Sequence, residues 1–366
     1  MIAAAQIGMV REDVDTPVLL LDLDIMEQNI AAMADLVRRS PVALRPHAKT
    51  HKTPIIAHKQ LAAGAIGITC AKLGEAEVMV AGGVRDVLIA NQIVGRRKIE
   101  RLVSLARHAD LIVAVDDARN VDALSQATQA AGASLRVLVE VNVGMHRCGV
   151  EPGQPALDLA QKVDQAPHLT FAGLMGYEGH LVFVPSLEER VHRVRNDLQA
   201  LIDTVEFVES NGLPVETVSS GGTGTAMITS TLPRITEIQA GSYVFMDGRY
   251  QTIEGVEFVC ALSLLTTVVS RPAPDRIIID AGMKTISHEF GLPRFKERDD
   301  LELLGLSEEH GTVRLADPSI QLQPRDKLEL TPSHGDTTLN IHDAYYCLRN
   351  GRVEAIWPIA ARGRSQ

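Results

Sequence analysis

Three observations predict an α/β barrel followed by a β-rich domain. Short apolar runs, each followed by a helix-like segment, recur through the first two thirds of the chain. Their near-regular spacing gives seven or eight βα units, which favours a closed (β/α)8 barrel of the TIM type over an open sheet. Near residue 255 the alternation stops, and strand-like segments separated by Pro- and Gly-bearing turns follow.

The apolar runs assigned to βα units are PVLLLDL, GAIGITC, DVLIA, LIVAV, LRVLVEV, LTFAGLMGY and PVETVSSGG. The first helix is expected over residues 24–39, because Ile25, Ile30, Met33 and Leu36 form one apolar stripe. We assign residues 22–255 to the barrel and residues 256–366 to the β-rich domain. Residues 1–21 are grouped with the β-rich domain, because the apolar run after Thr16-Pro17 can add a strand to it.

Composition excludes several classes of protein. The chain has 366 residues, 36 basic and 46 acidic side chains and a net charge of -10, with no basic cluster to bind nucleic acid. No run approaches the roughly 20 apolar residues of a membrane helix, and the N-terminus does not resemble a secretion signal, so we expect a cytoplasmic protein. The four cysteines form no CxxC pair, which fits neither a zinc ribbon nor a disulfide framework.

The run PHAKTHK follows the strand-like VALR and contains Lys49. Polar residues at the carboxyl ends of barrel strands collect at one mouth. A lysine there can be partly desolvated, which lowers its pKa and frees the amine to form an imine. The alternative is a solvated basic loop.

Two later turns are rich in small residues. In SSGGTGT, at residues 219–225, backbone N–H groups can cradle a phosphate, and the hydroxyls of Ser219, Ser220, Thr223 and Thr225 can add donors. The second turn, in QAGSYVFMD, contains Gly241 and Ser242. Barrels commonly bind phosphate at their late strands, although a plain turn is the alternative reading of either segment.

Three further segments carry groups capable of chemistry. His334 and Asp336 in SHGDTTLNIHD would leave the same face of an extended backbone and could hold Mn²⁺, Mg²⁺ or Zn²⁺ with waters, or else form an unligated surface turn. GYEGHL offers Tyr177, Glu178 and His180 as acids or bases at a strand end. Arg147 in GMHRCG could bind an anion, hydrogen-bond a ring oxygen, or pair with a carboxylate.

Taken in order along the chain, these motifs resemble the fold-type III, alanine racemase-like enzymes that use pyridoxal phosphate. Within that group they resemble the D-threonine aldolases and D-serine dehydratases. The motifs that carry the resemblance are DTPVLLLDLD, PHAKTHK, CAKLGEAE, ANQIVG, GMHRCGV, GYEGH, SSGGTGT, EIQAGSYVFMD and a late HxD followed by ARG.

The resemblance implies a role for individual residues. Lys49 would bond covalently to the cofactor, Lys52 being the rejected candidate, and His180 would lie close to the substrate hydroxyl. The residues implied to lie at the cofactor or its substrate are Gln92, Arg147, Tyr177, Thr223, Gly241, Ser242 and Tyr250. His334 and Asp336 would be the metal pair, and a homodimer is expected.

The metal pair also favours one reaction. In this group the dehydratases use His and Cys to bind zinc, whereas the aldolases carry His and Asp, and a carboxylate at position 336 favours Mn²⁺ or Mg²⁺ over Zn²⁺. The sequence therefore predicts an aldolase that cleaves β-hydroxy-D-amino acids to glycine and an aldehyde. The alternatives are a D-serine or 3-hydroxy-D-aspartate dehydratase and a non-catalytic protein that binds pyridoxal phosphate.

Overall fold

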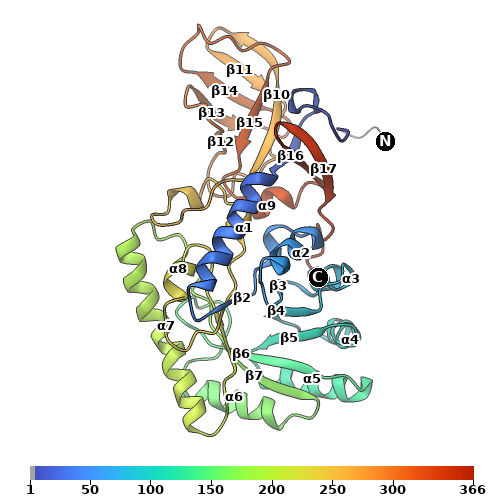
Figure 1. The fold of residues 1–366 in the computed structure, drawn as a ribbon, viewed down its shortest axis with the longest axis vertical. Coiled ribbons are helices and arrows are strands. Elements are labelled where there is room, and N and C mark those ends of the chain that lie inside the picture. The colour runs from blue at the N-terminus through green and yellow to red at the C-terminus, as the bar shows by residue number, and fades with distance from the viewer. Residues whose placement is uncertain (1–4) are drawn as a thin grey trace. The chain divides into compact units, whose positions relative to one another are not determined.

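The computed structural model describes residues 5–366, which divide into two compact units (Figure 1). One comprises Ala31–Gly241, Ile253–Val256 and Arg364–Gln366, and we call it the barrel unit. The other comprises residues 5–30, 242–252 and 257–363, and we call it the β-rich unit. None of the helices found in residues 5–366 has the length and apolar character needed to span a membrane.

The barrel unit is built on eight parallel strands in the order β2-β9-β8-β7-β6-β5-β4-β3. They are β2 (Ala43–Leu44), β3 (Ile68–Cys70), β4 (Asp86–Gln92), β5 (Asp110–Val115), β6 (Leu135–Glu140), β7 (Leu169–Met175), β8 (Thr217–Ser220) and β9 (Glu237–Ile238). The two ends of this order meet, because His47 bridges Thr69 and the Thr69 N–H donates to the Pro46 carbonyl oxygen at 2.9 Å. The predicted barrel is confirmed.

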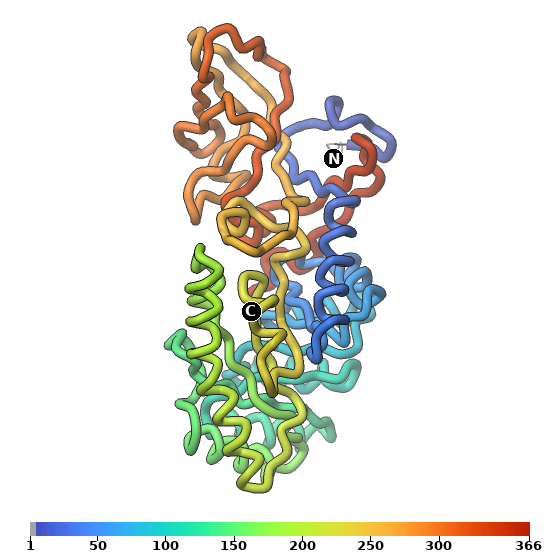
Figure 2. The backbone as a smooth tube through the Cα atoms, turned by 60° about the vertical axis from the view of Figure 1, so that its left-hand side comes forward, coloured from blue at the N-terminus to red at the C-terminus, as the bar shows by residue number. Residues whose placement is uncertain are grey.

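A helix follows every barrel strand from β2 to β8, as a βα repeat requires. These helices are α2 (Pro54–Ala62), α3 (Leu73–Ala81), α4 (Arg96–Leu105), α5 (Ala118–Ala131), α6 (Gln154–Gln165), α7 (Leu187–Ser210) and α8 (Ala226–Thr229). The longest, α7, packs against α6 and α8 (Figure 2). Helix α1 (Leu23–Arg38) confirms the helix predicted over residues 24–39.

The apolar runs are continuous because parallel strands covered by helices are buried on both faces. In β5, for example, Leu111 to Val115 are all buried. One hydrophobic cluster of the barrel unit contains Leu88, Ile112, Ala114, Leu138, Ala172 and Met175, which come from the neighbouring strands β4 to β7.

The β-rich unit contains a nine-stranded sheet, which confirms the predicted second domain. Its strands are β1 (Val18–Asp22), β10 (Leu262–Ala273), β11 (Arg276–Ile279), β12 (Arg294–Phe295), β13 (Leu301–Leu306), β14 (Gly311–Leu315), β15 (Lys327–Thr331), β16 (Ala344–Arg349) and β17 (Arg352–Pro358). The main path runs β13-β14-β11-β10-β1-β16-β17, and β15 pairs with both β10 and β12. A short helix, α9 (Gly335–Leu339), lies between β15 and β16.

Strand β1 belongs to this sheet and not to the barrel. It pairs antiparallel with β10 and parallel with β16. The prediction that PVLLLDL opens the βα repeat is therefore wrong, because this strand lies in the sheet of the β-rich unit. Four consecutive buried apolar residues suit either sheet, and only the distant partner strands decide between them. The barrel begins instead with the two-residue β2 in VALR.

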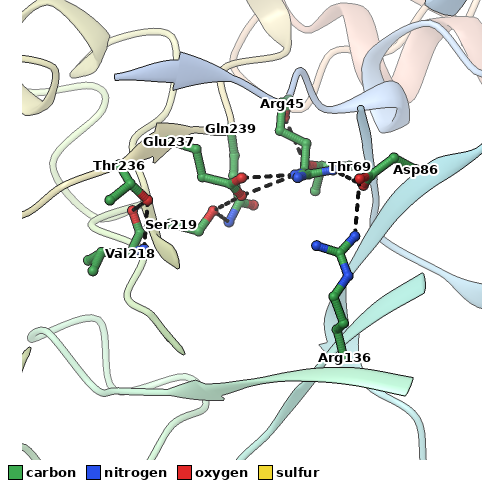
Figure 3. Close-up of polar contacts among 9 residues, drawn as sticks. All are labelled: Arg45, Thr69, Asp86, Arg136, Val218, Ser219, Thr236, Glu237 and Gln239. Atoms are coloured by element: carbon green, nitrogen blue, oxygen red, sulfur yellow. Dashed lines mark hydrogen bonds and ion pairs between the residues drawn. The ribbon is translucent and has the colours of Figure 1, made fainter. Parts of the chain in front are cut away.

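A network of charged side chains, in which Arg45 and Glu237 are buried and Asp86 and Arg136 are half-buried, links strands across the barrel (Figure 3). The Nε of Arg45 donates to both carboxylate oxygens of Glu237, at 3.0 and 3.2 Å, and its Nη1 donates to Asp86. Arg136 also donates to Asp86, at 3.0 Å, and the Ser219 hydroxyl donates to Glu237 at 2.7 Å. These contacts join β2, β9, β4, β6 and β8.

The pairing of Arg45 outweighs its burial. Burial by itself would lower the pKa of this guanidinium, but the carboxylates of Glu237 and Asp86 hold the pKa above its ordinary value. Gly67 leaves the space that the guanidinium occupies, because a Cβ there would overlap Arg45 Nη1 and the backbone oxygen of Asp86. The network therefore requires the arginine, its two carboxylates and the glycine together.

We expect Arg45→Met to destabilise the barrel unit by about 3 kcal/mol, because it leaves the buried Glu237 without its charged partner. The midpoint of thermal unfolding, followed by circular dichroism, should fall by roughly 6 °C or more. Arg38→Met is the matched control, because the Arg38–Asp35 pair is exposed and should contribute less than about 1 kcal/mol. Equal midpoints for the two variants would contradict a stabilising role for the network.

Candidate active site

The predicted site residues of the barrel unit all lie at or just beyond the carboxyl ends of its strands. Lys49 follows β2, Gln92 ends β4, Arg147 follows β6, Tyr177 and His180 follow β7, Thr223 follows β8 and Gly241 follows β9. Because the eight strands are parallel, these ends meet at one mouth of the barrel. Six strands therefore contribute to one group of side chains.

The segment that carries Lys49 packs against the turn that carries Gly241. Lys49 lies in a short 3₁₀ helix, η2 (Ala48–Thr50), and its N–H donates to His47 Nδ1 at 3.3 Å. A Cβ on Gly241 would lie 2.6 Å from the His47 carbonyl oxygen and 3.1 Å from the Thr50 hydroxyl. Only glycine fits so close to the lysine-bearing turn, so the structure brings these two predicted segments together.

Cationic groups gather around His47. Burial lowers the pKa of His47 well below its usual range, and the neighbouring Lys49, His51, Lys52 and Arg147 lower it further. His47 is therefore neutral near pH 7. Of these groups Lys49 and Arg147 supply positive charge, which suits a ligand that carries negative charge.

Gln92, Arg147 and Tyr177 are linked through a buried carboxylate and a ring contact. The side-chain amide of Gln92 donates to Glu140 at the end of β6. Burial raises the pKa of Glu140, while Gln92 and Arg147 act in the opposite direction. The Arg147 guanidinium carbon lies 5.5 Å from the centre of the Tyr177 ring, within cation–π range.

The SSGGTGT loop is held from within by Glu178, whose side chain has no exposed surface. This carboxylate accepts from the hydroxyls of Ser220, Thr225 and Thr229 at 2.9, 2.7 and 2.6 Å, and from the Gly221 N–H at 3.1 Å. The expectation that Glu178 offers an acid or base is wrong, because its oxygens are occupied by these donors.

The same contacts correct the expected set of phosphate donors. The Ser219 hydroxyl donates to Glu237, and those of Ser220 and Thr225 donate to Glu178, so these three hydroxyls are committed within the protein. The cofactor role of Thr223 in this loop rests on the resemblance. A Cβ on Gly224 would overlap the Val182 carbonyl group, so the backbone of Gly224 packs directly against the backbone of Val182.

Two neighbours in the loop after β7 are also fixed by contacts. Gly179 leaves room for the Tyr177 ring, because a Cβ on Gly179 would lie 2.3 Å from a ring carbon. His180 Nε2 lies 2.7 Å from an oxygen of Asp197 on α7. Asp197 carries no motif and lies 17 residues from His180, so the sequence reading missed it.

In the β-rich unit, Asp247 organises two predicted segments. Its buried carboxylate accepts from the N–H groups of Arg249 and Tyr250, each at 3.0 Å, and from the Gly335 N–H at 3.1 Å. Burial raises the pKa of Asp247, although these backbone donors oppose the shift. One carboxylate thus fixes both the turn with Tyr250 and the segment between His334 and Asp336.

The segment with His334 and Asp336 is not the extended chain we expected. Gly335 begins α9 and Asp336 lies in its first turn, because Asp247 holds the Gly335 N–H and an acidic residue is favourable at a helix N-terminus. His334 Nδ1 lies 2.8 Å from a Glu289 oxygen, and its ring packs 4.6 Å from that of Phe290. Glu289 lies 45 residues earlier in the chain and was also missed by the sequence reading.

The arrangement around His334 suits one ligand of a metal ion. A carboxylate commonly holds one nitrogen of a metal-binding histidine so that the other can ligate. Glu289 holds Nδ1 in this way, which leaves Nε2 for a ligand, and the contact lowers the pKa of Glu289. No group of three or more His, Cys, Asp or Glu side chains suited to a metal occurs in residues 5–366.

The barrel-unit residues fit the cofactor implied by the resemblance. They supply a lysine at a strand end, neighbouring cations and a glycine-rich loop whose close packing excludes side chains. Lys52, the other lysine of PHAKTHK, is buried in an ion pair with Glu75. Lys49 is therefore the better candidate for a covalent bond to a ligand.

Comparisons with known proteins agree with this arrangement. Residues 21–248 match the family described as alanine racemase, N-terminal domain, and residues 261–348 match the putative serine dehydratase domain. The chain is 43% identical to D-threonine aldolase of Arthrobacter sp. over 99% of this chain and 96% of that protein. It is 38% identical to 3-hydroxy-D-aspartate aldolase of Paracoccus denitrificans (strain Pd 1222) over 98% of this chain and 94% of that protein.

The comparison of structures gives the same result. The crystal structure of D-threonine aldolase from Filomicrobium marinum superposes with a TM-score of 0.98 and 42% identity, covering 100% of both chains. The resemblance found in the sequence is thereby confirmed. The chain belongs to the fold-type III, alanine racemase-like family of pyridoxal-phosphate enzymes, within the group of D-threonine aldolases and D-serine dehydratases.

Proposed function

We propose that this protein is an aldolase that cleaves β-hydroxy-D-amino acids of the D-threonine type to glycine and an aldehyde. The observation that carries the proposal is its full-length similarity to D-threonine aldolase. The enzyme would use pyridoxal phosphate and a divalent metal. Its assembly as a homodimer belongs to the same proposal and rests on the family resemblance alone.

Lys49 would hold the cofactor covalently, and the residues around the barrel mouth would bind and orient it. Gln92, Arg147, Tyr177, Thr223 and Gly241 carry this role, together with Ser242 and Tyr250, which follow Gly241 along the chain. When bound, pyridoxal phosphate supplies an electron-withdrawing ring that accepts the electron pair of the Cα–Cβ bond.

The protein's own contribution to bond cleavage is removal of the proton from the β-hydroxyl group. His180 is the proposed base, because its ring is held by Asp197 and a neutral imidazole nitrogen can accept a proton. A dehydratase would instead expel the hydroxyl group, for which proton removal from oxygen gives no assistance.

His334 and Asp336 would hold the metal, with Glu289 orienting His334. The carboxylate of Asp336 favours Mn²⁺ or Mg²⁺ over Zn²⁺. A bound divalent ion would supply positive charge that acidifies a hydroxyl group. Asp336 is also the residue that favours the aldolase over the dehydratase within this group.

The substrate class can be tested with purified protein supplied with pyridoxal phosphate and Mn²⁺. We expect D-threonine to yield glycine and acetaldehyde, L-threonine to yield neither, and EDTA to abolish the reaction until Mn²⁺ is restored. Pyruvate and ammonia from D-serine would instead indicate a dehydratase. No turnover of any β-hydroxy-D-amino acid, with cofactor bound, would indicate a non-catalytic protein.

The lysine assignment predicts that Lys49→Ala loses the visible absorbance of bound cofactor on dialysis. Lys98→Ala, which removes an exposed lysine on α4, should retain the absorbance and is the matched control. Borohydride reduction of the unmodified protein, followed by peptide mass spectrometry, should place the cofactor mass on the peptide that contains Lys49. A label on Lys52 would contradict the assignment.

The metal assignment predicts that Glu289→Ala weakens Mn²⁺ binding by about 10-fold to 100-fold, because His334 loses the carboxylate that fixes its ring. Glu308→Ala is the matched control, since Glu308 is exposed and pairs with Lys284. Affinity can be measured by electron paramagnetic resonance of free Mn²⁺. Asp336→Ala should lose the ion altogether, and retention of full affinity would refute the site.

A further inference from the structure

His180 and Asp197 form a hydrogen-bonded pair across two elements of the barrel unit. The separation of His180 Nε2 and Asp197 Oδ2 is 2.7 Å, and the side chains are 25% and 31% exposed. Asp197 lies within the long helix α7, which gives its carboxylate a firm position. The pair therefore joins the loop after β7 to that helix.

The hydrogen bond determines which nitrogen of the neutral imidazole carries the proton. An ionised carboxylate can only accept, so Nε2 must be the donor and its N–H points to Asp197. The lone pair of the neutral ring then lies on Nδ1. This nitrogen is buried and has no hydrogen-bond partner anywhere in residues 5–366.

An unpartnered buried nitrogen is costly and points to a ligand that donates to it. Leaving a buried acceptor without a donor costs about 1 to 3 kcal/mol. The loop does not relieve this cost by rotation, because the His180 ring is held by Asp197 and the Leu181 N–H donates to the Glu178 carbonyl oxygen at 2.9 Å. A hydroxyl group of a substrate would satisfy Nδ1.

The loop after β6 lies against the pair. Gly144 has a φ of +98°, and a Cβ there would be 3.4 Å from Asp197 Oδ2 and 3.5 Å from His180 Nε2. Its backbone therefore packs beside the hydrogen bond and limits access of water to it. Glu178, the other carboxylate close to His180 in the chain, is occupied by the loop after β8.

We propose that Asp197 is a positioning residue that makes Nδ1 of His180 the atom that accepts the β-hydroxyl proton. This inference rests on the proposed aldolase function. The substrate O–H bond breaks and its proton passes to Nδ1, while the oxygen electron pair completes the C=O bond of the aldehyde. The pair from the Cα–Cβ bond stays with the glycine fragment, which gains a proton at Cα. Asp197 keeps its hydrogen bond to Nε2 and stabilises the imidazolium.

The test compares Asp197→Asn with Asp203→Asn, a matched change at an exposed aspartate on the same helix. We expect Asp197→Asn to lower kcat for D-threonine by about 10-fold or more, with KM nearly unchanged. Asp203→Asn should leave both constants nearly unchanged.

A second measurement does not depend on activity. Long-range ¹H–¹⁵N spectra of histidine-labelled protein, assigned with His180→Gln, should show Nε2 protonated and Nδ1 unprotonated in the neutral ring. Asp197→Asn should lose this preference, and Asp203→Asn should keep it. If D-threonine yields no glycine, the proposed function fails. The spectra would still show whether Asp197 fixes the proton of His180 on Nε2. An unchanged kcat in Asp197→Asn, or a proton on Nδ1 of the neutral ring, would overturn the inference.

Discussion

Glu178 ties the loop after β7 to the loop after β8, and the mouth of the barrel depends on that connection. Its fully buried carboxylate accepts hydrogen bonds from three hydroxyl groups and from the Gly221 N–H. A buried carboxylate without such donors would be strongly destabilising, so the two loops must keep their relative positions for the charge to be satisfied. Tyr177 and His180 flank Glu178 in the sequence, and their backbone positions are constrained by the same contacts.

Two histidines of the protein are each oriented by a carboxylate, with opposite results. Asp197 contacts Nε2 of His180, which leaves Nδ1 with the lone pair. Glu289 contacts Nδ1 of His334, which leaves Nε2. The same kind of interaction can therefore prepare a proton acceptor in the barrel unit and a metal ligand in the β-rich unit. In both, the carboxylate contacts one ring nitrogen and leaves the other for the proposed role.

The sequence was sufficient where the signal is local. Alternating apolar runs and helical periodicity predict the barrel, and the side chains that end those runs lie at its mouth because parallel strands share a direction. The sequence-based prediction was wrong where a short segment is compatible with two different structures. The apolar run of β1 suits either sheet, and HGD begins a helix because the distant Asp247 holds Gly335. Asp197 and Glu289 carry no local signal, because only the folded chain brings them to their histidines.

The two lysines of PHAKTHK show how the fold separates similar residues. Glu75 accepts from the N–H groups of Ala71 and Lys72 at 2.8 and 3.2 Å, which fixes the start of α3, and the same carboxylate pairs with Lys52. Because that pair is buried, releasing the Lys52 amine would leave a charge without its partner beneath α3. Lys49 lies in the short turn η2, which packs against Gly241. The buried pair with Glu75 therefore gives Lys52 a structural role, which supports the proposal that Lys49, and not Lys52, holds the cofactor.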